Sequence, residues 1–193
     1  AAVAMEVLLG FVLGLLMLLP VAALQLAGSL MGLQLGFGLG AVINPALESE
    51  SDVISETLMV IALGAFIAMG GLEVLLACVA ATFRTVPLAT AGAGTPPADL
   101  VMGAFAGGFE LALRIAAPVL GILMIETVIS AFLMKTMPQL NILSIGFAVK
   151  IVLGLLAIAM ALHAIDAALV DAMSGAGRSA LRWSAGVPSG EGS

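Results

Sequence analysis

Apolar residues run along this chain in four long blocks, which polar breaks separate. The first block holds 41 consecutive uncharged residues between Glu6 and Glu48, a length that would reach about 60 Å as one helix. A hydrocarbon core is only about 30 Å thick. We therefore predict a first helix over residues 3–19 that continues, bent at Pro20, into a second helix over residues 21–35.

The second apolar block follows a cluster of acidic residues. Ser51 or Asp52 can cap a helix that runs to about Phe83, because a long apolar run follows them. Two adjacent glycines, Gly70 and Gly71, interrupt this run. They predict that the helix bends or ends there.

Two further blocks complete the pattern. Threonines, glycines and prolines within residues 84–99 predict a flexible loop. Residues 100–136, with a kink at Pro118, and residues 140–170 predict two more helical blocks. Residues 171–193 are rich in glycine and polar groups, so we predict a polar, disordered tail there.

The composition places these helices in a membrane environment. Hydrophobic residues make up 62% of the chain and charged residues 9%, with a mean hydropathy of +1.26. Soluble domains carry roughly 25% charged residues. The sequence therefore predicts an all-α, integral-membrane-type fold that faces lipid, other hydrophobic subunits or both. Twelve acidic residues against six basic ones, with no basic stripe, argue against a nucleic-acid partner.

Glycines recur at helical spacing in three places. Small residues four positions apart form a stripe on which a neighbouring backbone can approach closely. We expect such packing at Gly28 and Gly32, the start of a run that reaches Gly40; chance in a glycine-rich chain is the alternative for isolated pairs. The full set is Gly28, Gly32, Gly36 and Gly40, with the pairs Gly10 and Gly14, and Gly103 and Gly107.

A proline turn separates the third and fourth blocks. Pro138 disfavours helix at Met137, so one helix should end there and the next should start near Gln139 or Leu140. Gln139 and Asn141 are costly in hydrocarbon unless they are paired. The sequence therefore predicts a helical hairpin whose turn lies in an interface or against other protein.

This turn carries a family resemblance. The chain resembles the C-terminal hairpin of the FliR family of flagellar export gate components, whose type III secretion counterpart is SctT. Lys135 stands where that family often has arginine, and Ala148 stands where a proline is common, which should straighten the start of the last helix. We expect the chain to begin inside a longer protein. The matching residues are Pro138, Gln139, Asn141, Gly146, Phe147 and Lys150.

The resemblance extends to the first block. Residues 32–36 and the pair Asn44-Pro45 are similar to the family's segment around its plug, although Asn44 stands where aspartate is frequent. The resemblance implies a plug or gate loop; a simple helix-terminating linker is the alternative. The loop would comprise Gly36, Phe37, Gly38, Leu39, Gly40, Ala41, Val42, Ile43, Asn44 and Pro45, and the assembly turn would comprise Pro138, Gln139, Asn141, Gly146 and Lys150.

The resemblance also implies an architecture and partners. Residues 1–117 would be related to FliP and residues 118–170 to FliQ, as kinked helical hairpins packed side by side in a hetero-oligomeric gate. The implied role is a structural and gating subunit of a protein export channel in the bacterial inner membrane, at a flagellar basal body or an injectisome base. Implied partners are FliP-like, FliQ-like, FlhB-like and FlhA-like components, unfolded secreted proteins and membrane lipid.

Charged residues inside the apolar blocks give a second hypothesis. Glu110 and Arg114 lie one helical turn apart and predict a buried ion pair. Glu126 has no partner within one helical turn, so we expect it to find a partner across a helix or subunit interface, or to be protonated. Together with Lys150, these residues would form the relay of a small secondary transporter, which is the alternative function.

Catalytic and metal-binding patterns are weak. The acidic cluster of Glu48, Glu50, Asp52 and Glu56 is typical of a solvated helix start, because it lacks metal-ligand spacing. His163 and Asp166 favour a polar helix end, although an intramembrane enzyme built on this single histidine remains a third reading. Cys78 is interpreted as a small core residue. We expect no enzymatic activity, no metal and no cofactor.

Overall fold

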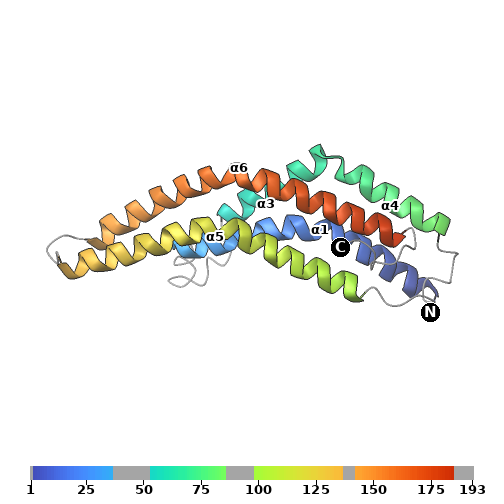
Figure 1. The fold of residues 1–193 in the computed structure, drawn as a ribbon, viewed down its shortest axis with the longest axis horizontal. Coiled ribbons are helices and arrows are strands. Elements are labelled where there is room, and N and C mark those ends of the chain that lie inside the picture. The colour runs from blue at the N-terminus through green and yellow to red at the C-terminus, as the bar shows by residue number, and fades with distance from the viewer. Residues whose placement is uncertain (1, 37–52, 86–97, 137–141, 185–193) are drawn as a thin grey trace, which may run out of the picture. The chain divides into compact units, whose positions relative to one another are not determined.

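The computed structural model describes residues 2–36, 53–85, 98–136 and 142–184. Within these ranges the chain is helical and has no strand (Figure 1). This confirms the all-α prediction. The helices are α1 (Ala2–Leu35), α3 (Val53–Ala68), α4 (Gly71–Thr85), α5 (Ala98–Thr136) and α6 (Ile142–Ser184).

Helix α1 joins the two helices predicted on either side of Pro20. It runs through that proline without a break and ends at Leu35, where the sequence predicted an end. Gly36 follows with φ +89°, a left-handed conformation that favours glycine. The backbone N–H of Gly36 donates to the carbonyls of Gly32 and Leu33, both at 3.1 Å, and so satisfies carbonyls that the helix end leaves open.

Helices α3 and α4 meet at a bend of 62°. Gly70 lies at the bend with φ +75°, and a Cβ on Gly71 would collide with the ring of Phe66. The left-handed backbone therefore favours glycine at position 70, and a side chain at position 71 would require the Phe66 ring to move. The bend confirms the break predicted at these two positions.

Helix α6 is longer than the sequence predicted. The expected helix ended at residue 170 and a disordered tail began at 171, but α6 continues to Ser184. Leu169, Met173, Gly177 and Ala180 are buried along this extension at helical spacing. Packing of this stripe outweighs the low helix propensity of the local glycines and serines, so the predicted tail was wrong for residues 171–184.

The chain forms two compact units, and α1, α3, α5 and α6 contribute to both. Unit 1 comprises residues 1–23, 60–111 and 169–193, and unit 2 comprises residues 24–59 and 112–168. Each compact unit therefore combines segments that are distant in the sequence. The predicted division into residues 1–117 and 118–170 is of another kind, because it states which part of the chain is related to FliP and which to FliQ. This relationship stays a prediction, and α5 passes through Pro118 without interruption.

Unit 1 is built around the first half of α1. Its core joins α1 to Cys78 of α4 and Ala180 of α6, and residues of α5 pack against it. Cys78 is 1% exposed and is a free thiol, which confirms its interpretation as a small core residue. The buried core residues are Val12, Leu13, Leu16, Met17, Cys78 and Ala180.

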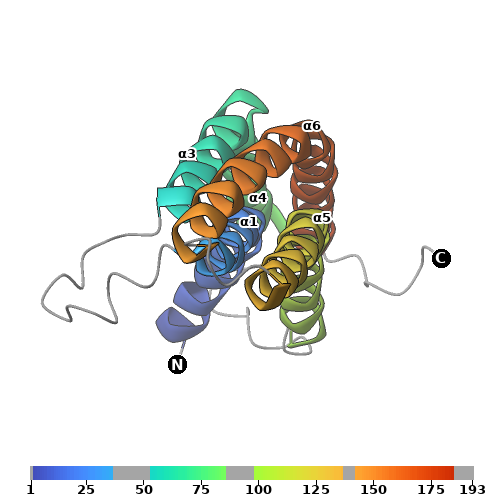
Figure 2. The same ribbon diagram turned by 90° about the vertical axis from the view of Figure 1, so that its left-hand side faces the viewer.

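Unit 2 is built around the second half of α1. Leu24, Ala27, Met31 and Leu35 are fully buried at spacings of three and four residues, which form one face of a helix. Figure 2 shows α1, α3, α5 and α6 of this unit nearly end-on. A Cβ on Gly154 of α6 would collide with Leu35, so α6 passes close to this stripe.

Two helices are long and apolar enough to cross a membrane. In the described residues these are Glu6–Leu35 and Leu100–Thr136, with mean hydropathies of 2.7 and 2.1. The bent α3–α4 pair would be a third span if both halves belong to one crossing. This supports the membrane character that the composition predicted.

Candidate functional site

The exposed surface of α4 and α5 is strongly apolar. Leu72, Leu76, Val79 and Phe83 of α4 are exposed and recur at helical spacing. On the α5 part of unit 2, Ile125, Val128 and Phe132 form a similar stripe, with Val128 68% and Phe132 69% exposed. We call these three residues the α5 outer face. Apolar stripes of this kind require cover by lipid or by another protein.

The tightest helix contact in unit 2 joins α1 to α3 at Gly28. A Cβ on Gly28 would lie 2.5 Å from Cα and 2.9 Å from the backbone nitrogen of Ser55. Backbone atoms cannot rotate away, so only glycine fits at this crossing. Gly32 is buried one turn further along α1. The spacing of these glycines indicated the stripe, but nothing in the sequence identified Ser55 as its counterpart.

Two hydroxyls fasten this crossing. The Ser55 hydroxyl, 6% exposed, donates to the Gln25 carbonyl at 2.9 Å. The Ser29 hydroxyl donates to Ser55 Oγ at 3.1 Å. We call Gly28, Ser29 and Ser55 the α1–α3 crossing. This contact holds the end of α1 against the start of α3. Residues 37–52, which connect the two helices, lie outside the described residues.

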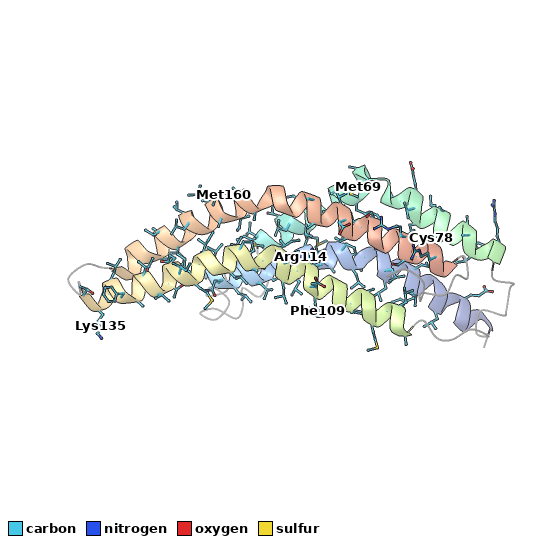
Figure 3. All side chains as sticks on the ribbon, in the orientation of Figure 1. Met69, Cys78, Phe109, Arg114, Lys135 and Met160 are labelled. Carbon is cyan, nitrogen blue, oxygen red and sulfur yellow. The ribbon has the colours of Figure 1, made fainter. Side chains whose placement is uncertain are left out.

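The predicted hairpin is formed by α5 and α6. A Cβ on Gly146 of α6 would lie 3.5 Å from Ser130 Oγ of α5, and Leu123 of α5 approaches Gly154 of α6. This confirms that the two helices pack together on either side of the proline turn. Lys135 projects from the end of α5 beside that turn (Figure 3).

Glu126 is the one carboxylate on the inward stripe of α5 in the described part of the chain. It is 6% exposed, and the Ser130 hydroxyl donates to its Oε1 at 2.6 Å. The expectation of a partner only across a helix or subunit interface was therefore wrong. A serine four residues later is within reach on a helix, and this spacing was visible in the sequence.

The predicted buried ion pair differs from the structure. Glu110 and Arg114 lie one turn apart on α5, but both side chains are exposed in this chain. The prediction of burial was wrong because long charged side chains on the outer side of a helix extend into their surroundings. Figure 3 labels Arg114 on α5. Of the remaining relay candidates, Glu126 is buried and Lys150 is half-buried.

Most of the predicted gate loop and assembly turn lies outside the described residues. Gly36 alone of the loop is described, at the end of α1, and residues 37–45 are not. In the turn, Pro138, Gln139 and Asn141 are likewise outside, whereas Gly146 and Lys150 are half-buried on α6. The roles of both segments stay predictions.

The two other glycine pairs differ from Gly28. A Cβ on Gly10, Gly14, Gly103 or Gly107 would meet nothing within 4 Å in the described parts of the chain. Spacing alone therefore did not distinguish a glycine that contacts another helix from one that lies on an open surface.

Most of the remaining candidates lie outside what the structure describes. His163 and Asp166 lie in α6, but their side chains are outside the described set, as are Glu48, Glu50 and Asp52. Glu56 is exposed in the first turn of α3. No cluster of metal-binding side chains occurs among the described residues.

These features define a class before any comparison. Long apolar helices, a bent α3–α4 pair and exposed apolar stripes are those of a helical membrane protein that packs against lipid or other subunits. The comparison with known families is more specific. The model of bacterial export proteins, family 1, matches residues 1–176, and the chain belongs to this family.

Similar proteins carry one name. The chain is 30% identical over 149 residues to flagellar biosynthetic protein FliR of Bacillus subtilis (strain 168), covering 76% of this chain and 58% of that protein. FliR of Pectobacterium carotovorum subsp. carotovorum is 30% identical over 159 residues, covering 81% and 60%. FliR of Escherichia coli (strain K12) is 27% identical over 150 residues, covering 78% and 58%.

The matches confirm the resemblance that the proline turn and the first block indicated. The matches also show how much of the related proteins this chain covers. The chain spans about three fifths of the length of these relatives.

Proposed function

We propose that this chain is part of a structural and gating subunit of the bacterial protein export channel that serves flagella or type III secretion. Membership of the export family over residues 1–176 is the observation that carries this proposal. The relatives named above are flagellar biosynthetic proteins, which favours the flagellar system. In this role the protein lines and plugs the entrance for secreted proteins and catalyses no reaction.

The exposed apolar stripes support assembly with other subunits. A chain that leaves Val128 and Phe132 more than two thirds exposed has an apolar helix face without cover from its own residues. FliP-like and FliQ-like subunits would cover part of this surface, and lipid the remainder. FlhB-like and FlhA-like components would lie further along the path of unfolded substrates. The assembly would sit in the inner membrane, at a flagellar basal body or an injectisome base.

The α1–α3 crossing supports a gate at residues 36–45. A plug must be held at both ends if it is to close a channel and still move. Helix α1 ends at Gly36, and Gly28 and Ser55 lock α1 to the start of α3. The chain on both sides of this segment is therefore held by one contact. Residues 36–45 within it are rich in glycine and carry no charge, which suits a place surrounded by protein.

Deletion of residues 38–43 in the full-length protein tests the gate. The assembled complex should still form, because the α1–α3 crossing is retained, but membranes that contain it should leak ions or small solutes. Membrane conductance and co-purification of the subunits are measured on the same cells. Thr57→Ala is the control, since it removes one exposed hydroxyl of α3 outside the crossing and leaves the loop intact. Unchanged conductance from a fully assembled deletion variant would refute the plug.

Liposomes that contain the isolated protein separate this proposal from the transporter alternative. An export gate subunit alone should carry no solute. Flux that requires Glu126 and Lys150 would indicate a transporter instead, and the gate proposal would then fail.

A further inference from the structure

Unit 1 contains a cavity of about 290 Å³ next to the bend between α3 and α4. This volume is at the lower end of the roughly 300–1,000 Å³ typical of ligand sites. Figure 3 labels Met69 at the bend. The walls are mainly apolar and come from four helices, including Met17, Pro20, Phe66, Met69, Val74 and Met173.

The cavity follows from the local backbone. The chain turns by 62° between α3 and α4, so neither helix fills the space inside the bend. Gly71 and Gly177 also line it and contribute no side chain. A Cβ on Gly177 would lie 3.2 Å from Val74 Cγ1, so α6 already lies as close to α4 as that position allows.

One side of the cavity carries an oriented positive charge. Arg178 and Ser174 both line it. The Ser174 hydroxyl donates to the Asp171 carbonyl at 2.9 Å and accepts from Arg178 Nη1 at 3.2 Å. This chain of hydrogen bonds holds the guanidinium at the rim. A guanidinium has five N–H donors, so the bond to Ser174 leaves it able to bind an anion.

We propose that this cavity binds one acyl chain of an anionic phospholipid, with the lipid phosphate on Arg178. The apolar walls suit a hydrocarbon tail, and an exposed arginine beside them suits a phosphate at headgroup level. Arg182 lies one turn further along α6, is exposed and does not line the cavity. The proposal rests on the membrane character of the chain and not on its role in export.

Charge complementarity favours a lipid over a partner helix. A neutral apolar side chain would fill the cavity but would leave Arg178 at its edge without an anionic ligand, whereas a phospholipid satisfies both. The nearby acidic residue Glu73 is exposed in the first turn of α4 and does not line the cavity. It therefore does not occupy the position assigned to the phosphate.

Native mass spectrometry of the full-length protein tests the site. Protein released from detergent is titrated with dioleoylphosphatidylglycerol, with dioleoylphosphatidylcholine and with inorganic phosphate. We expect one tightly retained phosphatidylglycerol, about tenfold weaker retention of phosphatidylcholine, and no retention of inorganic phosphate. A tenfold change corresponds to about 1.4 kcal/mol, close to the lower limit for a hydrogen bond to a charged group.

Three variants sharpen the result. Arg178→Gln should weaken phosphatidylglycerol about tenfold and bring it to the level of phosphatidylcholine. Arg182→Gln is the matched control, because it removes the same charge one turn away and outside the cavity. It should leave retention nearly unchanged. Ala176→Leu places a larger side chain on the cavity wall and should abolish retention of both lipids. Thermal unfolding in detergent checks that each variant is folded.

Four outcomes would overturn the proposal. These are no retained lipid, equal retention of both lipids by the unchanged protein, equal effects of the two arginine variants, or binding of inorganic phosphate as tightly as the lipid. A further experiment places a photoreactive amino acid at position 176 and identifies what it cross-links to in the assembled complex. Cross-links to lipid support the proposal, and cross-links to a partner subunit contradict it.

Discussion

Helices α1 and α5 have nearly the same hydropathy but different surroundings. Their most apolar windows average 2.7 and 2.1, yet 47% of the α1 window is buried inside the chain against 28% of the α5 window. The glycines of the two helices differ in the same way. Gly28 of α1 lies against the backbone of Ser55, whereas a Cβ on Gly103 of α5 would have no described atom within 4 Å. Hydropathy therefore indicates that a helix avoids water, but not whether protein or lipid replaces the water.

The largest effect should come from breaking the α1–α3 crossing. Gly28→Leu places a side chain where even a Cβ would lie 2.5 Å from Ser55 Cα. Overpacking costs about 1–3 kcal/mol when side chains can yield, and here a helix backbone must move. We expect a large loss of thermal stability in detergent, measured by circular dichroism. Gly103→Leu is the control on α5, and an equal loss from both would contradict the contrast between the helices.

A smaller loss should follow from removing the hydroxyl of the same crossing. Ser55→Ala eliminates the bonds to the Gln25 carbonyl and to Ser29 but creates no collision. The expected cost is about 2 kcal/mol, because two intramolecular hydrogen bonds are lost and each typically contributes about 1 kcal/mol net. Chemical unfolding in mixed micelles measures it. Thr57→Ala, at an exposed α3 hydroxyl bonded only to its own helix, should cost less, and the reverse order would refute the crossing.

Glu126→Gln should change the stability less again. The amide oxygen can still accept the hydrogen bond from Ser130, which is 2.6 Å from the carboxylate in the native chain. Removing a buried carboxylate without changing its volume costs little when the hydrogen bond remains. We expect normal assembly and less than about 1 kcal/mol of change. Loss of export from a stable, assembled variant would show that the carboxyl group itself acts in export.

The smallest change in stability is expected from a substitution at Gly103, and this change should be a gain and not a loss. Gly103→Ala fills open space on α5 and removes a glycine from a helix interior, which stabilises helices by about 0.5–1 kcal/mol. The isolated protein should therefore unfold slightly later. If assembly with the partner subunits weakens at the same time, a partner approaches α5 at this glycine. A lower stability of the isolated protein would mean that Gly103 is packed within its own chain.

Much of the helical layout was predictable from local rules. The Gly70-Gly71 pair and the end of α1 before Gly36 each change the backbone in a way that depends on a few neighbouring residues. These breaks were found at their correct positions. The proline turn also identified the family, because side-chain amides are rare between two apolar runs.

The rest depended on contacts distant in sequence. Residues 171–184 have poor helix propensity, and only the burial of Met173 and Ala180 explains why α6 continues. Ser55 was one serine among several until its position against Gly28 was known. The cavity beside Arg178 arises from a bend angle, which the two glycines indicated but did not specify.

The assignment as an export gate subunit is tested most directly by the mass of the complex. The full-length protein is co-expressed with the FliP-like and FliQ-like proteins proposed above as its partners, extracted in mild detergent and weighed by native mass spectrometry. We predict one assembly that contains all three proteins and loses this chain when the α5 outer face is made polar by Val128→Asp. Separate species for the three proteins, with this chain stable on its own, would contradict the account.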